Sequence, residues 1–146
     1  MGPIAKALTS PQRKSLAAYY ASSSSKFARV AVDKAAIRPE NAGAWLANRG
    51  RWNDGIPACI ACHGSGGAGV PPTFPPLAGQ SATYLATQLN DWKSGKREPG
   101  PQAMMVLIAG KLSSADIDGV SHYFGSLQPL TNAGIESAPK KKGTSK

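Results

Sequence analysis

Residues 55–64 read GIPACIACHG, and this short stretch decides what kind of fold the chain can build. It contains the only two cysteines, Cys59 and Cys62, followed directly by His63. Cysteines three positions apart cannot link distant segments by a disulfide. With 16 Gly and 12 Pro among 146 residues, much of the backbone is predicted to be turn and loop. A small domain of this kind needs another source of stability, which favours a core built around a bound group.

Several kinds of site use this pattern of residues. A Cys-x-x-Cys pair can be a thioredoxin-type redox site, but no alternation of strands and helices surrounds it here. It can be half of a zinc site, but zinc needs four ligands, and the other histidine, His122, is expected at the surface of a helix. The third is attachment of a c-type haem. The two thiols then add to the vinyl groups on one porphyrin edge, and the next residue presents its imidazole to the iron.

A haem iron that only carries electrons takes a second axial ligand, and a thioether favours the Fe(II) state. Met104 and Met105 are the candidates downstream, and the 42 residues from His63 to Met105 leave room for a helix and a loop. A methionine is otherwise a filler of hydrophobic cores. Two adjacent methionines point in different directions, so we expect one to bind the iron and the other to pack.

The remaining sequence predicts an all-α chain, because no strand pattern of convincing length is present. Cap and stop signals give four helices outside the Cys-x-x-Cys-His turn. The first helix is capped by Thr9 and Gln12 and ends at residues 22–25, and the second is short, contains Trp45 and Leu46 and ends near Gly50. The third is capped by Ser81 and ends at Gly95, and the fourth is capped by Ser113 and Asp116. Their expected apolar faces are Leu16, Ala17, Tyr19 and Tyr20; then Tyr84, Leu85, Gln88, Leu89 and Trp92; then Ile117, Val120, Phe124 and Leu127.

The chain contains an internal repeat at an offset of 104 residues. Residues 1–22 read MGPIAKALTSPQRKSLAAYYAS, and residues 105–126 read MVLIAGKLSSADIDGVSHYFGS. The methionine, the Leu-Ser/Thr cap and the aromatic pair keep register. Two unrelated amphipathic helices with similar caps are the alternative.

From Gly55 onward the chain resembles the class I bacterial cytochromes c, and most of all one domain of the two-haem periplasmic (c-four-like) type. The matching stretches are IPACIACHG (56–64), FPPLAGQ (74–80), YLATQLNDWKSGKR (84–97) and MMVLIAGKLSSADIDGVSHYFGSL (104–127). The resemblance implies a small fold wrapped around one covalent haem c, with an extra N-terminal helix. It also implies an electron carrier rather than an enzyme, located in the periplasm.

The resemblance also implies roles for single residues. Cys59 and Cys62 would form the thioethers, and His63 would be the proximal ligand. The register before Leu112 makes Met105 the distal ligand. The carbonyl of Pro75 would accept the proton of His63 Nδ1, and Leu77 would pack on the haem face. Arg97 is the best candidate for the propionates, ahead of three weaker ones, Gln80, Tyr84 and Trp92.

The same resemblance divides the chain into four parts. They are a remnant terminal helix of a preceding cytochrome domain (1–24), a linker (25–40), a monohaem cytochrome c domain (41–128) and a disordered basic tail (129–146). The family's two-haem type has two attachment motifs and this chain has one, with Met1 in the register of a first domain's axial methionine. We therefore expect a fragment of a two-haem protein, which would also account for the missing signal sequence.

The formal net charge of +9 bears on partners. It favours acidic docking patches on a redox partner such as a reductase, a dehydrogenase or a terminal oxidase, with association to a membrane surface as a further candidate. No nucleic-acid-binding module is visible, and no stretch is long and apolar enough to span a bilayer. Two other functions stay open at this point: a haem subunit or tail of a larger dehydrogenase, and a haem sensor of a gas or peroxide.

Overall fold

The computed structural model describes residues 6–22, 30–98, 100 and 103–128. These residues form α-helices and short 3₁₀ turns, and within them there is no strand, only the isolated bridges Arg51–Ile56 and Val70–Phe74. The prediction of an all-α fold is confirmed. The α-helices are α2 (Ser10–Ser22), α3 (Ala42–Arg49), α4 (Cys59–His63), α5 (Ala82–Lys93), α6 (Met104–Lys111) and α7 (Ser114–Ser126). The predicted basic tail, 129–146, lies outside the described residues.

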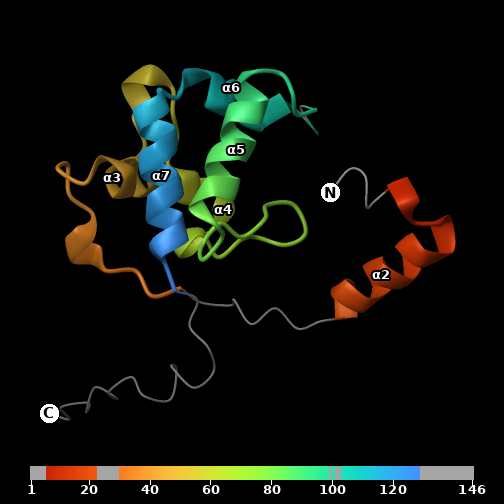
Figure 1. Cartoon of the computed structure of the whole chain (residues 1–146). Coiled ribbons are helices and arrows are strands. Elements are labelled where there is room, and N and C mark those ends of the chain that lie inside the picture. The colour runs from red at the N-terminus through yellow and green to blue at the C-terminus, as the bar shows by residue number, and fades with distance from the viewer. Residues whose placement is uncertain (1–5, 23–29, 99, 101–102, 129–146) are drawn as a thin grey trace, which may run out of the picture.

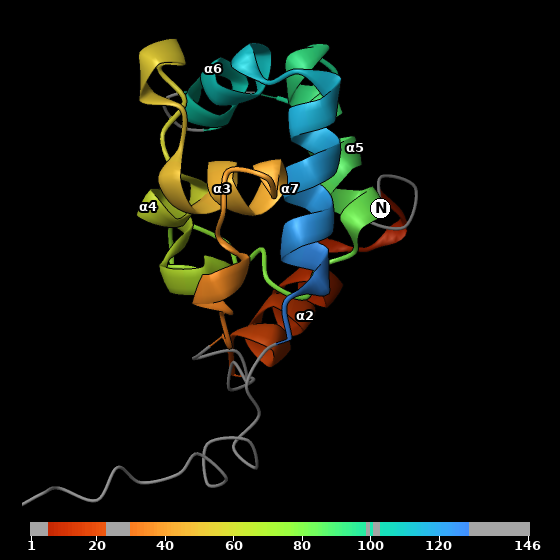
Figure 2. The same cartoon turned by 90° about the vertical axis from the view of Figure 1, so that its left-hand side faces the viewer.

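Helix α7 is the centre of the bundle and packs against both α3 and α5 (Figures 1 and 2). At the crossing of α3 and α7, Gly43 meets Gly119 so closely that a Cβ on Gly43 would lie 2.2 Å from the Gly119 carbonyl oxygen. The backbones can approach to this distance only because both residues lack a side chain. The glycine pair therefore fixes how α3, which leads into the Cys-x-x-Cys-His turn, lies on α7.

Two apolar clusters fill the space between these helices. One contains buried Leu46, Ile56, Leu112, Ile117 and Val120, and the other contains Ala47, Ala78, Leu85, Phe124 and Leu127. All four residues predicted for the apolar face of the last helix are buried. In α5 the expected face is only partly correct, since Leu85 is buried but Tyr84 is half exposed.

The helix starts follow the predicted caps. Ser113 and Asp116 form a complete capping box at α7, and the Ser81 hydroxyl accepts from the Tyr84 N–H at α5. Gly50 ends α3, donating its N–H to the Leu46 carbonyl at 2.9 Å. Helix α5 ends at Lys93 with Ser94 as its cap, one residue before the predicted stop at Gly95.

Helix α2 begins as predicted but has no buried residue. The backbone N–H of Thr9 donates to Gln12 Oε1 at 2.8 Å, and the Gln12 N–H donates back to Thr9 Oγ1 at 3.5 Å, as expected for a capping box. Its apolar side chains stay in contact with solvent, with Leu16 42% and Tyr20 70% exposed. Figure 1 shows α2 lying apart from the bundle of the other helices. In the described ranges, no helix has both the length and the apolar character needed to cross a bilayer.

Candidate functional site

The site is built on α4, which consists of the five residues Cys59–His63. The segment before it is held against the end of α3, where Gly50 has a φ of +72° and a Cβ would lie 2.6 Å from the Ala58 nitrogen. Only glycine fits there without strain. After His63 the chain turns sharply at Gly64, whose φ is +77°. The two glycines therefore confine the two thiols and the imidazole to a single helical turn.

His63 is buried, and its Nδ1 lies 2.8 Å from the Pro75 carbonyl oxygen. A carbonyl can only accept, so the proton of a neutral ring is on Nδ1 and the lone pair is on Nε2. Burial lowers the pKa of His63, which favours the neutral ring. Neutral imidazole with a fixed tautomer is the form that binds a metal, and the second-shell carbonyl also fixes the ring orientation.

The loop 64–79 brings Pro75 back to the helix. Gly69 donates its N–H to the His63 carbonyl at 2.7 Å, and Val70 pairs with Phe74 in a narrow turn. The loop closes where Leu77 donates its N–H to the Gly67 carbonyl at 2.8 Å. Pro75 lies 12 positions after His63 in the sequence, so their contact depends on the whole loop.

Both cysteines are half-buried, and they are not joined to each other by a disulfide. Cys59 packs, together with Ile60 and Leu77, against the buried cluster around Phe124. Burial raises the pKa of the unmodified Cys59 thiol to about 11, which reflects the apolar surroundings of this sulfur. Leu77 thus packs against the same buried cluster as Cys59, and its contact with the haem face stays a prediction.

A second polar cluster lies at the end of α5. The Arg97 guanidinium sits 3.9 Å above the Trp92 ring and donates to Gln88 Oε1 at 2.6 Å. The Trp92 indole nitrogen is buried and has no hydrogen-bond partner among the described residues. A buried donor without a partner is costly. An indole N–H beside a guanidinium is a suitable donor set for a carboxylate, such as a haem propionate.

The other residues considered from the sequence are not gathered into this cluster. Gln80 uses its Oε1 to accept from the Ser81 N–H at 2.8 Å, which is a local contact, and Tyr84 is half exposed. Gln88, which holds Arg97, was missed because it was expected only as part of the apolar stripe of its helix. The feature that could have identified Gln88 as a functional residue is that it is a polar side chain within an otherwise apolar stripe.

Met104 and Met105 form the first turn of α6 and are half-buried. Helix α6 packs mainly against α5, whereas α4 packs against α3 and the turn η3 (Ser65–Gly67). Figures 1 and 2 both show α6 above α4. The structure thus brings His63 and Pro75 together. Met105 belongs to α6, whereas His63 belongs to α4.

The zinc interpretation finds no support in the described part of the chain, where no three or more His, Cys, Asp or Glu residues could together hold a metal ion. His122 is an exposed surface residue, as expected, with its Nδ1 3.2 Å from Asp118 Oδ1. A site with one imidazole and two thiols in one turn fits a haem better than a bare ion.

Comparison with known proteins supports the same assignment. A family model described as Cytochrome c matches residues 43–128. The chain is 44% identical over 128 residues to the thiosulfate dehydrogenase electron acceptor of Stutzerimonas stutzeri (strain A1501), covering 87% of this chain and 58% of that protein. It is 40% identical over 114 residues to cytochrome c4 of Azotobacter vinelandii, covering 77% of this chain and 52% of that protein. The chain thus spans little more than half the length of these relatives.

Among solved structures, the thiosulfate dehydrogenase TsdBA of Marichromatium purpuratum is similar, with a TM-score of 0.72 and 35% identity. The match covers 96% of this chain and 30% of that one. The family model covers more than half of the chain, and the similar solved structure shares its fold. The chain therefore belongs to the cytochrome c family, and its prosthetic group is a covalently attached haem c.

Proposed function

We propose that this chain carries single electrons, with its haem c linked through Cys59 and Cys62 and its iron bound by His63 and Met105. The observation that carries the proposal is the buried His63 ring, whose Nδ1 lies 2.8 Å from the Pro75 carbonyl oxygen. That contact leaves Nε2 with its lone pair for the iron. The two thiols on the same turn supply the covalent links.

The bound haem supplies a one-electron couple between Fe(III) and Fe(II). The residues of the chain control that couple. The Pro75 carbonyl accepts the ring proton and fixes the ring orientation, and the apolar side chains of Leu77 and Phe124, which pack in one cluster, would exclude water from the haem. Arg97 and the buried Trp92 N–H would pair with a propionate, which is supported by the unpartnered indole nitrogen beside the guanidinium.

The same residues argue for a carrier rather than an enzyme. A thioether from Met105 would close the second axial position and leave no open site for a substrate. The net charge of +9 would steer the chain towards an acidic patch on its partner. Haem attachment of this type follows export, so we place the chain in the periplasm.

A dehydrogenase is the partner that the relatives favour. One relative is named as the electron acceptor of thiosulfate dehydrogenase, and the TsdBA structure matches 96% of this chain. The chain would then receive electrons one at a time from such an enzyme, either as a separate carrier or as one of its haem subunits. Stopped-flow mixing of the ferric holoprotein with thiosulfate dehydrogenase and thiosulfate tests this. Rapid reduction that needs both components is expected, and no reduction would contradict it.

The haem assignment is tested on the full chain, exported in a bacterial host with c-type maturation machinery. We expect a pyridine haemochrome spectrum of haem c and haem retained on a denaturing gel. The Cys59→Ser, Cys62→Ser double variant should retain none. The matched pair His63→Ala and His122→Ala separates a ligand from a surface histidine, because only the first should change the spectrum. A colourless chain with two free thiols would refute the proposal.

We also propose that α2 is the terminal helix of a second cytochrome domain of the same kind. Tyr19 and Tyr20 contact edge to face at 5.2 Å, as Tyr123 and Phe124 do at 5.2 Å in α7. Leu16 is exposed, although its counterpart in the repeat, Val120, is buried. Deleting residues 1–24 should therefore leave the melting temperature of the holoprotein nearly unchanged, whereas a large loss would show that α2 packs on this domain.

A further inference from the structure

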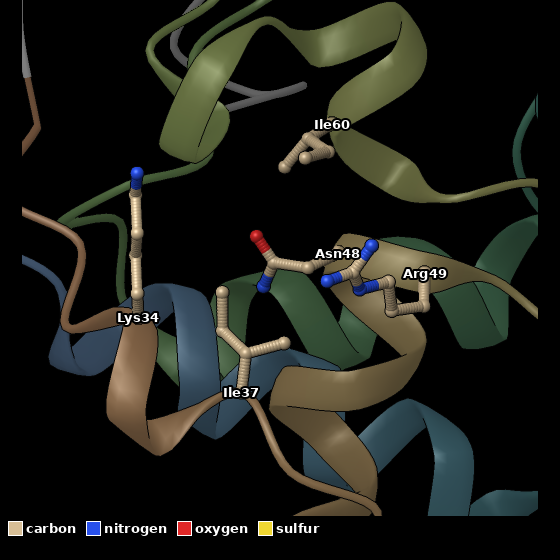
Figure 3. A pocket seen from close by; sticks show the side chains of 5 residues that line it. All are labelled: Lys34, Ile37, Asn48, Arg49 and Ile60. Atoms are coloured by element: carbon tan, nitrogen blue, oxygen red, sulfur yellow. The ribbon is translucent and has the colours of Figure 1, made fainter.

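An open pocket of about 320 Å³ lies between α3, the turn η1 (Lys34–Ala36) and the attachment turn. Its lining residues are Lys34, Ile37, Asn48, Arg49 and Ile60 (Figure 3). Its volume is at the lower end of the range for small-molecule sites. None of these residues is among those proposed above to bind the haem.

Two cations face this pocket from opposite sides, Lys34 from η1 and Arg49 from the end of α3 (Figure 3). In the part of the chain that the structure describes, neither forms an ion pair with a carboxylate. The acid next to Lys34, Asp33, uses its side chain to accept from the Ala35 N–H at 2.8 Å. The pocket therefore presents two positive charges that form no ion pair within the described residues.

Asn48 gives the pocket a fixed polar wall. Its Nδ2 donates to the Ala44 carbonyl at 2.8 Å and to the Tyr123 hydroxyl at 2.8 Å, which uses both amide hydrogens. The amide cannot turn without losing these bonds, and its Oδ1 faces the pocket (Figure 3). An oxygen with free lone pairs accepts a hydrogen bond and repels an anionic oxygen.

The apolar part of the lining is Ile37 and Ile60, on opposite sides of the space (Figure 3). They would contact carbon atoms and contribute by burying apolar surface. A ligand complementary to this lining therefore has two separated negative charges, a short carbon chain between them and one hydroxyl donor.

We propose that this pocket binds a small hydroxydicarboxylate, with one carboxylate at Lys34, the other at Arg49 and the hydroxyl donating to Asn48 Oδ1. Guanidinium and ammonium groups form charge-assisted hydrogen bonds with carboxylates. A dicarboxylate without the hydroxyl leaves the Asn48 oxygen without a donor and binds more weakly. An inorganic oxoanion brings neither carbon chain nor donor and binds weakest.

The occupant would lie beside the haem, because Ile60 stands between Cys59 and Cys62 in the attachment turn. Added negative charge near the iron favours the ferric state, so the oxidised protein should bind the anion more tightly than the reduced one. This part rests on the proposed function. Threefold tighter binding to the ferric form corresponds to a potential lowered by about 28 mV for one electron.

The test is an NMR titration of the ferrous holoprotein with malate, succinate and sulfate at constant ionic strength. We expect saturable shifts at Ile37, Asn48 and Ile60, with malate binding at least threefold more tightly than succinate and sulfate weakest. Lys34→Gln and Arg49→Gln should each weaken malate binding fivefold or more. Lys96→Gln removes the same charge from an exposed lysine outside the pocket and should leave it unchanged.

Shifts that do not saturate, or that are equal in Lys34→Gln, Arg49→Gln and Lys96→Gln, would overturn the proposal, since the anion would then only screen surface charge. A potentiometric titration with and without malate tests the redox linkage separately. An unchanged potential with saturable binding would refute the linkage and leave the site. The titration does not depend on what reduces the haem, so its failure is distinct from failure of the carrier function.

Discussion

His63 Nδ1 and the Pro75 carbonyl oxygen lie 2.8 Å apart. This contact depends on Gly69, which lies between the two residues in the sequence. Gly69 has a φ of +87°, and a Cβ there would lie 2.8 Å from the Pro76 nitrogen and 3.1 Å from the Phe74 oxygen. The segment that carries the Pro75 carbonyl thus rests directly on Gly69. The orientation of the imidazole thus depends on a close backbone contact.

Gly69→Ala should displace that segment and weaken the bond to His63. We expect the holoprotein to lose about 1–3 kcal/mol more unfolding free energy than Gly95→Ala does. Gly95 has a φ of +72° but nothing within 4 Å of its Cβ position, so it carries only the backbone strain. A weaker acceptor on Nδ1 makes the imidazole a poorer donor to iron, so the reduction potential should rise. Chemical denaturation and potentiometry check this, and equal effects of the two substitutions would contradict it.

Met105→Ala should remove the distal ligand and leave an open axial position. We expect a high-spin component in the ferric absorption spectrum, a lower potential, and carbon monoxide binding by the ferrous form. Met104→Ala is the matched control, because both residues lie half-buried in the first turn of α6. It should keep the low-spin spectrum and lose only packing. If Met104→Ala gave the high-spin spectrum and Met105→Ala did not, Met104 would be the ligand. A low-spin spectrum in both variants would show that neither methionine binds the iron.

The parts of this structure that were predictable from the sequence are those that depend on local chemistry. Ser113 and Asp116 form a capping box from residues three apart, and the attachment turn is contained in five residues. Helix α6 was not predicted because its N-cap, Ala103, has a φ of 50° and no side-chain cap, so no start signal exists.

Contacts between distant segments were not derivable from residue types. The Gly43–Gly119 crossing joins residues far apart in the chain. A glycine in a helix does not indicate which residue it contacts in another helix. The approach of Pro75 to His63 was expected only from the resemblance to a family. The pocket between Lys34 and Arg49 was not expected, because it needs the turn η1 to fold back on α3.

Gly43→Ala should destabilise the fold strongly. The new methyl carbon would lie 2.2 Å from a backbone oxygen of α7, and backbone cannot move aside as a side chain can. We expect a loss of about 3 kcal/mol or more in unfolding free energy. Gly110→Ala, in α6 with nothing within 4 Å, is the control and should be neutral or stabilising by up to about 1 kcal/mol. Similar melting temperatures for the two variants would show that the helix crossing is not close.

Asp116 gives the fold a dependence on acid pH. The Arg51 guanidinium donates to both Asp116 carboxylate oxygens, at 3.1 and 2.9 Å, and lowers the pKa of that carboxyl from 3.8 to about 2. Since the folded pKa lies below the unfolded one, the stabilisation is complete above the unfolded pKa and is lost as the pH falls from about 4 to about 2. The Arg51 side chain is 44% exposed, so solvent screening reduces the contribution of this ion pair to the unfolding free energy to about 1 kcal/mol.

Unfolding free energies of the wild type and Asp116→Asn should therefore differ at pH 6 and converge towards pH 2. Asp118→Asn, on the same helix with a 72% exposed side chain, should differ less from the wild type at pH 6. A gap between wild type and Asp116→Asn that stayed constant down to pH 2 would show that the carboxylate acts only as a helix cap and not through its charge.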